Sequence, residues 1–152
     1  MRYQLYLARL PRTPRPRPRT MGDMVKARHK GAPPTESFEA LMAKGQEALD
    51  RADLNGAERH FGQATVVKPA SPTAWYGKGR AFALQEEWEK ALRCFSIATK
   101  FDPKFGNAWA GVAACYAHLD EREKAREALA RAESLGADHS LLAEIRAGLE
   151  RA

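Results

Sequence analysis

The hydrophobic positions between residues 74 and 103 predict two short amphipathic helices joined by a tight turn. In the first helix, Trp75, Gly79 and Phe82 are spaced by four and three residues, so they share one face. The second helix has a matching apolar stripe, which consists of Trp88, Ala91, Leu92, Phe95 and Ala98. Pro103 ends this helix because proline has no N–H to donate. Neither helix can bury its stripe alone, so the pattern predicts further helices on both sides.

The same pattern recurs with a period of 34 residues. Three windows keep the order of bulky, small and aromatic residues: 38–71, 72–105 and 106–139. Trp75, for example, aligns with Trp109 in the third window and with Leu41 in the first. This pattern resembles the tetratricopeptide repeat, a helix–turn–helix unit of 34 residues.

The resemblance implies an all-α protein, a tetratricopeptide α-solenoid in which helix–turn–helix repeats form a right-handed superhelix. We expect seven helices in a domain that spans residues 35–152. Six of them belong to the repeats, and a capping helix over 139–151 covers the apolar flank of the last repeat. The predicted core consists of Trp75, Gly79, Phe82, Ala91, Phe95, Trp109, Tyr116 and Ala125. We expect both tryptophans and Tyr116 to face this core, away from any ligand.

The positive charge of the chain is concentrated at its N-terminus. The formal charge is +6, but residues 1–36 hold nine Lys or Arg against two acids, and the other 116 residues hold sixteen against seventeen. The repeats therefore lack an overall field that would attract polyanions. We predict that residues 1–34 are a basic, Arg/Pro-rich disordered tail, because alternating Arg and Pro favours a solvated polyproline II conformation. Its apolar residues are too few and too interrupted for a transmembrane segment.

Three functions of this tail stay open. It is a disordered appendage or upstream extension, a basic arm that binds nucleic acid or an anionic membrane, or a targeting signal or proline-motif ligand.

The sequence shows no convergent catalytic chemistry, so we predict that the protein is not an enzyme and needs no cofactor or metal. The four histidines are scattered without metal-ligand spacing. Cys94 and Cys115 lie within helical patterns and are interpreted as small core residues. Two thiols without C-x-x-C spacing or a secretory signal favour a reducing compartment, and we expect a cytoplasmic protein.

In the tetratricopeptide architecture, the first helix of each repeat lines a concave groove. Carried over to this chain, the resemblance implies a peptide-binding groove lined by Met42, Gln46, Leu49, Tyr76, Gly77, Arg80, Leu84, Ala110, Gly111, Ala114 and His118. The small residues would let a ligand backbone approach closely, and the apolar ones would contact its side chains. The alternative is that the small residues only permit tight helix packing.

The leading functional prediction is an adaptor or scaffold that binds an apolar or amphipathic peptide segment in this groove. One subgroup of the family grips the carboxylate of chaperone tails with Lys, Asn and Arg, but Met42, Gln46 and Gly77 here supply no cation to such a clamp. Three repeats and a closing helix also resemble the chaperones of type III secretion translocators, so a chaperone-like protein is one alternative. A basic-arm binder of nucleic acid or membrane is another, and self-association through an exposed terminal flank stays open.

Overall fold

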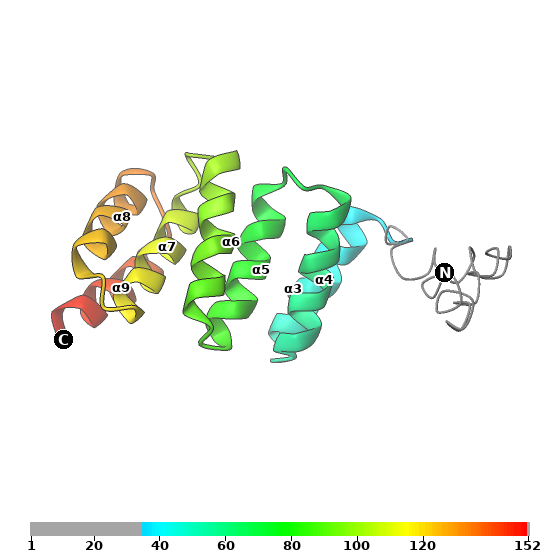
Figure 1. Ribbon diagram of the computed structural model, residues 1–152, viewed down its shortest axis with the longest axis horizontal. Coiled ribbons are helices and arrows are strands. Elements are labelled where there is room, and N and C mark those ends of the chain that lie inside the picture. The colour runs from blue at the N-terminus through cyan, green and yellow to red at the C-terminus, as the bar shows by residue number, and fades with distance from the viewer. Residues whose placement is uncertain (1–34, 152) are drawn as a thin grey trace, which may run out of the picture. The chain divides into compact units, whose positions relative to one another are not determined.

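The computed structural model describes residues 35–151, and within this range the protein contains seven α-helices and no strand (Figure 1). The helices are α3 (Phe38–Asp50), α4 (Leu54–Val67), α5 (Pro72–Leu84), α6 (Trp88–Phe101), α7 (Gly106–His118), α8 (Arg122–Ser134) and α9 (His139–Arg151). The predicted all-α fold with seven helices is confirmed. The predicted disordered tail lies outside the described residues. None of the described helices is long and apolar enough to cross a membrane.

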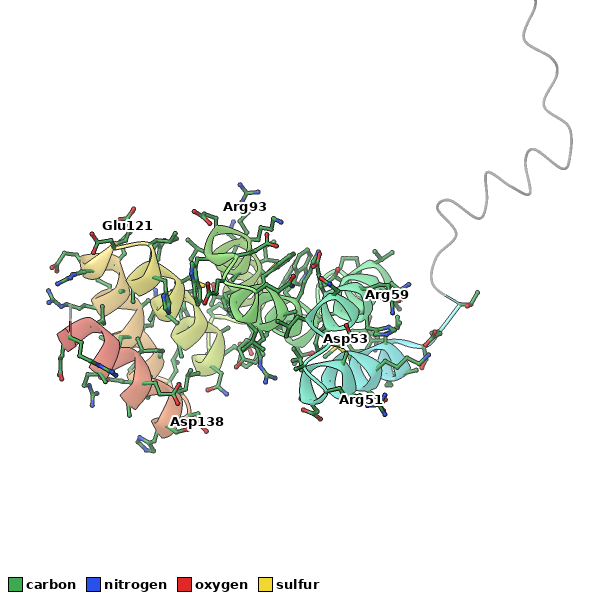
Figure 2. The ribbon with its side chains drawn as sticks, turned by 90° about the horizontal axis from the view of Figure 1, so that it is seen from below. Arg51, Asp53, Arg59, Arg93, Glu121 and Asp138 are labelled. Carbon is green, nitrogen blue, oxygen red and sulfur yellow. The ribbon has the colours of Figure 1, made fainter. Side chains whose placement is uncertain are left out.

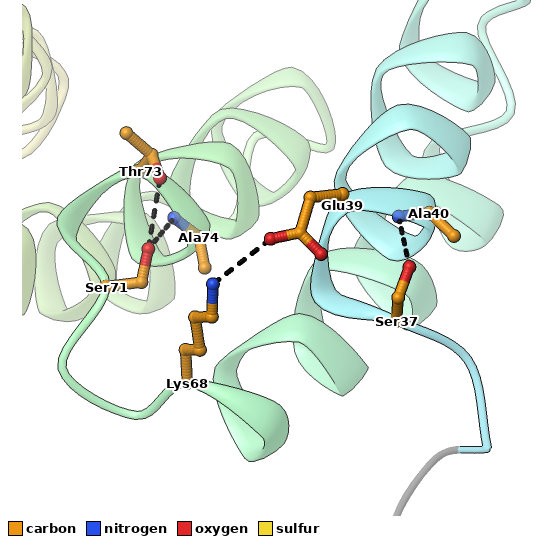
Figure 3. Close-up of polar contacts among 7 residues, drawn as sticks. All are labelled: Ser37, Glu39, Ala40, Lys68, Ser71, Thr73 and Ala74. Carbon is orange, nitrogen blue, oxygen red and sulfur yellow. Dashed lines mark hydrogen bonds and ion pairs between the residues drawn. The ribbon is translucent and has the colours of Figure 1, made fainter.

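Serine side chains cap the first helices of the first two repeats (Figure 3). The Ser37 hydroxyl accepts a hydrogen bond from the N–H of Ala40 at 3.1 Å, and the Ser71 hydroxyl accepts one from the N–H of Ala74 at 3.4 Å. Pro72 follows Ser71 as the first helical residue, where its missing N–H costs nothing. These local signals explain why α3 and α5 begin where they do.

A salt bridge joins the two helices of the first repeat at the end of α4 (Figure 3). The Lys68 ammonium lies 3.1 Å from the Glu39 carboxylate of α3 and 4.3 Å from the centre of the Phe38 ring. Hydrogen bonding to its own backbone N–H and to Lys68 lowers the pKa of Glu39. Both charged side chains are exposed, so we assign this pair a role in orientation rather than in stability.

Each turn within a repeat contains one residue in the left-handed region. These residues are Ala52, Glu86 and Asp120, with φ of 58°, 60° and 60°, and they are one repeat period apart. The turn of the first repeat consists of residues 51–53. Asp53 caps α4 by accepting from the N–H of Gly56 at 2.9 Å, so Leu54 already begins the helix.

Phenylalanines of the second helices fill the space between successive first helices. Phe61 of α4 is 2% exposed, and its ring lies against Gly45 of α3 and Gly77 of α5. Phe95 of α6 is 3% exposed and lies against Gly79 of α5 and Gly111 of α7. The aromatic ring of each of the first two repeats therefore contacts a glycine of its own repeat and a glycine of the next, which gives the stack a continuous interior.

Most of the predicted core residues are buried, namely Gly79, Phe82, Ala91, Phe95 and Ala125. Trp75, Trp109 and Tyr116 pack against this core, but their side chains are only partly buried. The indole N–H needs an acceptor. Trp75 donates to the carbonyl of Pro69 at 2.8 Å and Trp109 to that of Pro103 at 2.9 Å, so both rings lie beside the loop that precedes their helix.

Helix α9 packs against α7 and α8 of the last repeat. Leu142, Ile145 and Leu149 are its buried residues. Asp138 lies just before α9 (Figure 2). It caps this helix by accepting from the N–H of Leu141 at 3.2 Å and from Ser140. These contacts lower the pKa of Asp138, with the Ser140 hydroxyl as the largest cause. The chain therefore closes with a helix whose apolar side covers the third repeat.

Candidate functional site

The side chains of α3, α5 and α7 on the side of these helices opposite to Trp75, Trp109 and Tyr116 form one surface, which we call the first-helix surface. Its half-buried or exposed members are Gln46, Tyr76, Arg80, Leu84, Ala114 and His118. At 100° per residue, Ala114 and His118 lie on the side of α7 opposite to Trp109 and Tyr116. The structure therefore brings these six predicted groove residues to a single face of the stack.

A hydrogen bond crosses from the first to the second repeat on this surface. Arg80 donates from Nη1 to Oε1 of Gln46 at 3.2 Å, and the two residues occupy the same position in successive repeats. The Gln46 side chain in turn donates from Nε2 to the Asp50 carboxylate at 2.8 Å. This chain of contacts orients one amide, one guanidinium and one carboxylate for polar recognition.

Tyr76 supplies the aromatic centre of the first-helix surface. Its ring lies 4.9 Å from the Phe105 ring and 5.6 Å from the Phe95 ring, centre to centre. The Arg80 guanidinium lies 6.0 Å from the Tyr76 ring. Burial raises the pKa of the Tyr76 hydroxyl, and the charge of Asp138 adds to that effect while Arg80 opposes it. The phenol therefore stays protonated near neutral pH and can donate a hydrogen bond.

A hollow of about 250 Å³ lies between α7 and α9 on the same side. Its lining residues are Ala114, Ala117, His118, Leu141, Glu144, Ile145 and Gly148. At its edge, the imidazole of His118 stacks on the indole of Trp88, with ring centres 3.7 Å apart and planes within 3°. The hollow is mainly apolar, with one carboxylate and one imidazole as its polar groups.

Three of the predicted groove residues do not line a surface. Ala110 is 0% exposed, and Gly77 and Gly111 are buried. Added Cβ atoms at Gly77 and Gly111 would lie 2.5 Å and 2.8 Å from the rings of Phe61 and Phe95. Their small size serves helix packing, which is the alternative that the sequence left open.

Met42 and Leu49 have an intermediate position. Both are half-buried, and both pack against the core of the first repeat. They offer a ligand only part of their apolar surface.

Sequence reasoning missed three residues of this region. Phe105, Leu141 and Glu144 reach it from the loop before α7 and from α9. The helical period assigns faces within a repeat, but it does not specify which side chains of a non-repeat helix approach them.

A second hollow, which we call the outer groove, lies between α6 and α8 with α7 as its floor. Its volume is about 690 Å³, and Trp109, Val112 and Tyr116 form the floor. The indole of Trp109 is therefore accessible from outside, although the sequence predicted that it would not contact a ligand.

The reactive side chains of the domain are dispersed or buried. Among the described residues, no three His, Cys, Asp or Glu side chains are close enough to hold a metal ion. Burial raises the pKa of the Cys94 thiol from its ordinary value of 9.0 to about 11, and that of Cys115 to about 12. Both cysteines therefore lack nucleophilic thiolate character near neutral pH.

The comparisons with known proteins agree with this architecture. Residues 42–93 match the model of the tetratricopeptide repeat family. No curated protein matches the sequence. The tetratricopeptide domain of Sgt2 from Aspergillus fumigatus is 26% identical, with 78% of each chain covered and a TM-score of 0.67.

Two similar structures are described as complexes. The TPR2B domain–pHsp70 complex of yeast Sti1 gives a TM-score of 0.70 at 18% identity, with 75% of this chain and 96% of that chain covered. The first such domain of Spaghetti (RPAP3), bound to the HSP90 peptide SRMEEVD, gives 0.69 at 16% identity, with 75% and 91% covered. At these identities the likeness concerns the fold. The 34-residue period, the family match over residues 42–93 and the seven helices of residues 35–151 together show a tetratricopeptide fold with three repeats and a C-terminal capping helix.

Proposed function

We propose that this protein is a non-catalytic adaptor that binds a peptide segment of a partner protein on its first-helix surface. The observation that carries the proposal is the placement of Tyr76 and Arg80 beside each other, with Gln46 bonded to Arg80 across the repeat boundary. One aromatic ring and adjacent polar groups on a rigid helical face are suited to anchoring an extended or helical segment.

An apolar or amphipathic segment fits this surface better than an acidic chaperone tail. Leu84 is 57% exposed on α5, and the hollow between α7 and α9 is mainly apolar. Sti1 and Spaghetti are seen in complex with pHsp70 and with an HSP90 peptide, but the clamp positions Met42, Gln46 and Gly77 carry no cation here. We therefore propose a similar mode of binding with a different peptide chemistry. A chaperone for type III secretion translocators, a basic-arm binder and a cytoplasmic location stay predictions.

The test uses the full chain as bait, and then a synthetic peptide from a captured partner as the titrant. Arg80→Ala and Leu84→Glu should each weaken binding at least tenfold, because one removes a donor and the other places a charge in an apolar contact. Val66→Ser is the matched control, since Val66 is 63% exposed on the second helix α4. Circular dichroism checks that each variant is folded. Equal affinity of all variants would refute the assignment to this surface.

A further inference from the structure

We infer that the outer groove between α6 and α8 is a second docking site, and that it binds an acidic segment of a partner protein that carries an apolar side chain. This goes beyond the proposed function, because the first-helix surface lies on the opposite side of α7. The inference rests on the shape of the groove, on its charges and on a comparison with the aligned position one repeat earlier.

The floor of the outer groove is aromatic and apolar. Trp109 and Tyr116 are partly buried, and Val112 lies between them along α7. The indole N–H of Trp109 is already bonded to Pro103. The floor therefore offers aromatic and aliphatic surface rather than free donors, with Lys124 5.6 Å from the centre of the Tyr116 ring. This favours an apolar or aromatic side chain as the inserted group.

The banks of the outer groove are positively charged. Lys100 of α6 lies on one bank, and Lys124 and Arg131 of α8 lie on the other, against the single carboxylate of Glu127. Lys124 pairs with Glu121 at 2.9 Å, whereas neither Lys100 nor Arg131 forms an ion pair within residues 35–151. The Arg131 guanidinium lies 4.6 Å from the Trp109 ring, at the boundary between bank and floor. Two cations on facing banks are thus available to carboxylates of an acidic segment.

The corresponding place in the preceding repeat is occupied by a side chain of the protein itself. Lys78 aligns with Val112, and its ammonium lies 5.4 Å from the Trp75 ring and 5.9 Å from the Phe82 ring. A lysine thus covers the two aromatic rings that align with Trp109 and Tyr116. The shorter Val112 leaves the outer groove open.

The charge and the size of the outer groove favour an acidic peptide over other anionic partners. The part of the chain that follows residue 36 has sixteen Lys or Arg and seventeen acids, so no broad positive field surrounds the groove. A bounded hollow with two unpaired cations and one carboxylate suits a short acidic peptide better than a polyanionic backbone. The N-terminal segment of this chain is itself basic, so its charge argues against it as the occupant.

The probe is a fluorescein-labelled peptide of twelve residues in which Glu and Asp alternate with Leu and Phe, titrated with the full chain by fluorescence anisotropy. A peptide with Lys in place of the acids is the ligand control. We expect saturable binding of the acidic peptide only, and a weaker affinity at higher salt. Val112→Lys should reduce the affinity at least tenfold by filling the groove. Val112 is 4% exposed and Lys78 occupies the aligned position one repeat earlier, so circular dichroism checks that this variant is folded.

Charge reversal gives an independent variant that leaves the core intact. Lys100→Glu with Arg131→Glu should abolish binding of the acidic peptide, whereas Arg93→Glu should not. Arg93 is also exposed on α6 but points away from the protein and does not line the groove (Figure 2). Leu84→Glu should leave binding unchanged, which separates this site from the first-helix surface.

Each other outcome overturns the inference. The inference is wrong if the acidic peptide shows no saturable binding or if Val112→Lys does not weaken it. It is also wrong if Leu84→Glu lowers the affinity for this peptide as much as Val112→Lys does. Tighter binding of a twelve-nucleotide single-stranded DNA that depends on Lys100 and Arg131 would assign the groove to nucleic acid. A dimer in sedimentation that Val112→Lys dissociates would assign it to a second copy of the chain.

Discussion

The ring of Phe61 lies so close to Gly77 that an added Cβ at residue 77 would be 2.5 Å from two of the ring carbons. This contact joins the second helix of the first repeat to the first helix of the second repeat. Phe95 and Gly111 repeat it one period later, with the nearest approach at 2.8 Å. The repeats are therefore held together by a ring-to-glycine contact that tolerates no side chain.

Replacement of Gly77 by Ala should destabilise the protein by about 1–3 kcal/mol, because the Phe61 ring must move to admit the methyl group. Gly62→Ala is the matched control. Its nearest neighbour is Lys78 Cε at 4.0 Å, so the gain in helix propensity should raise the free energy of unfolding by about 1 kcal/mol. Urea unfolding followed by circular dichroism measures both changes. If Gly77→Ala leaves the free energy of unfolding unchanged, the two repeats do not pack as described.

Replacement of Ala52 by Gly should stabilise the protein, although glycine usually weakens helical proteins. Ala52 has φ of 58°, and a left-handed conformation costs a residue with a Cβ about 1–2 kcal/mol. Part of that gain is offset by the greater flexibility of glycine in the unfolded chain. Ala43→Gly, at an exposed site within α3, should instead lower the free energy of unfolding by about 1 kcal/mol. Equal losses in both variants would contradict the turn geometry.

Trp75→Phe and Trp109→Phe should have similar effects on stability, since each removes one indole hydrogen bond to a proline carbonyl. We expect a loss of about 0.5–1.5 kcal/mol for each variant in thermal unfolding. The two variants should differ in the peptide titration, because only Trp109 lines the outer groove. If Trp75→Phe is fully folded and still loses binding of the acidic peptide, the distinction between the two tryptophans is wrong.

The thiols of Cys94 and Cys115 should react slowly with a disulfide reagent at pH 8 while the protein is folded. Burial raises the pKa of these thiols to about 11 and about 12, so the native state holds little thiolate. Unfolding in urea should restore the reactivity of ordinary cysteines. Rapid labelling of both thiols in the native protein would contradict their burial.

The same pKa shift predicts how stability depends on pH. Between the ordinary value of 9.0 and about 12, the unfolded chain releases the Cys115 proton and the native state retains it. The stability that Cys115 contributes is therefore fully present below pH 9 and declines as pH rises through this window. The difference in unfolding free energy between the natural protein and Cys115→Ala should narrow above pH 9. If this difference in unfolding free energy stays constant above pH 9, the raised pKa of Cys115 is contradicted.

The sequence predicted the fold because its signals are local and periodic. The 34-residue period has a direct counterpart in the three helix pairs, and the helix expected to end at Pro103 ends at Phe101. Such features depend on neighbours in the chain, which a single sequence displays.

The candidate site was less predictable because it depends on distances between repeats. The helical period places Gly77 and Gly111 on the side of the first helices, but it does not show that a phenylalanine of the preceding repeat covers them. The half-burial of Trp109 depends on the loop at Pro103, and the outer groove depends on Val112 in place of lysine. These are properties of contacts between elements rather than of patterns within one.

The most direct test of the account is a titration of the full chain with a synthetic peptide from a captured partner, compared with the same titration of Arg80→Ala and of Val66→Ser. If the first-helix surface binds the partner, Arg80→Ala raises the dissociation constant at least tenfold and Val66→Ser leaves it unchanged. If Val66→Ser weakens binding and Arg80→Ala does not, the partner binds the second helices and the central claim is wrong.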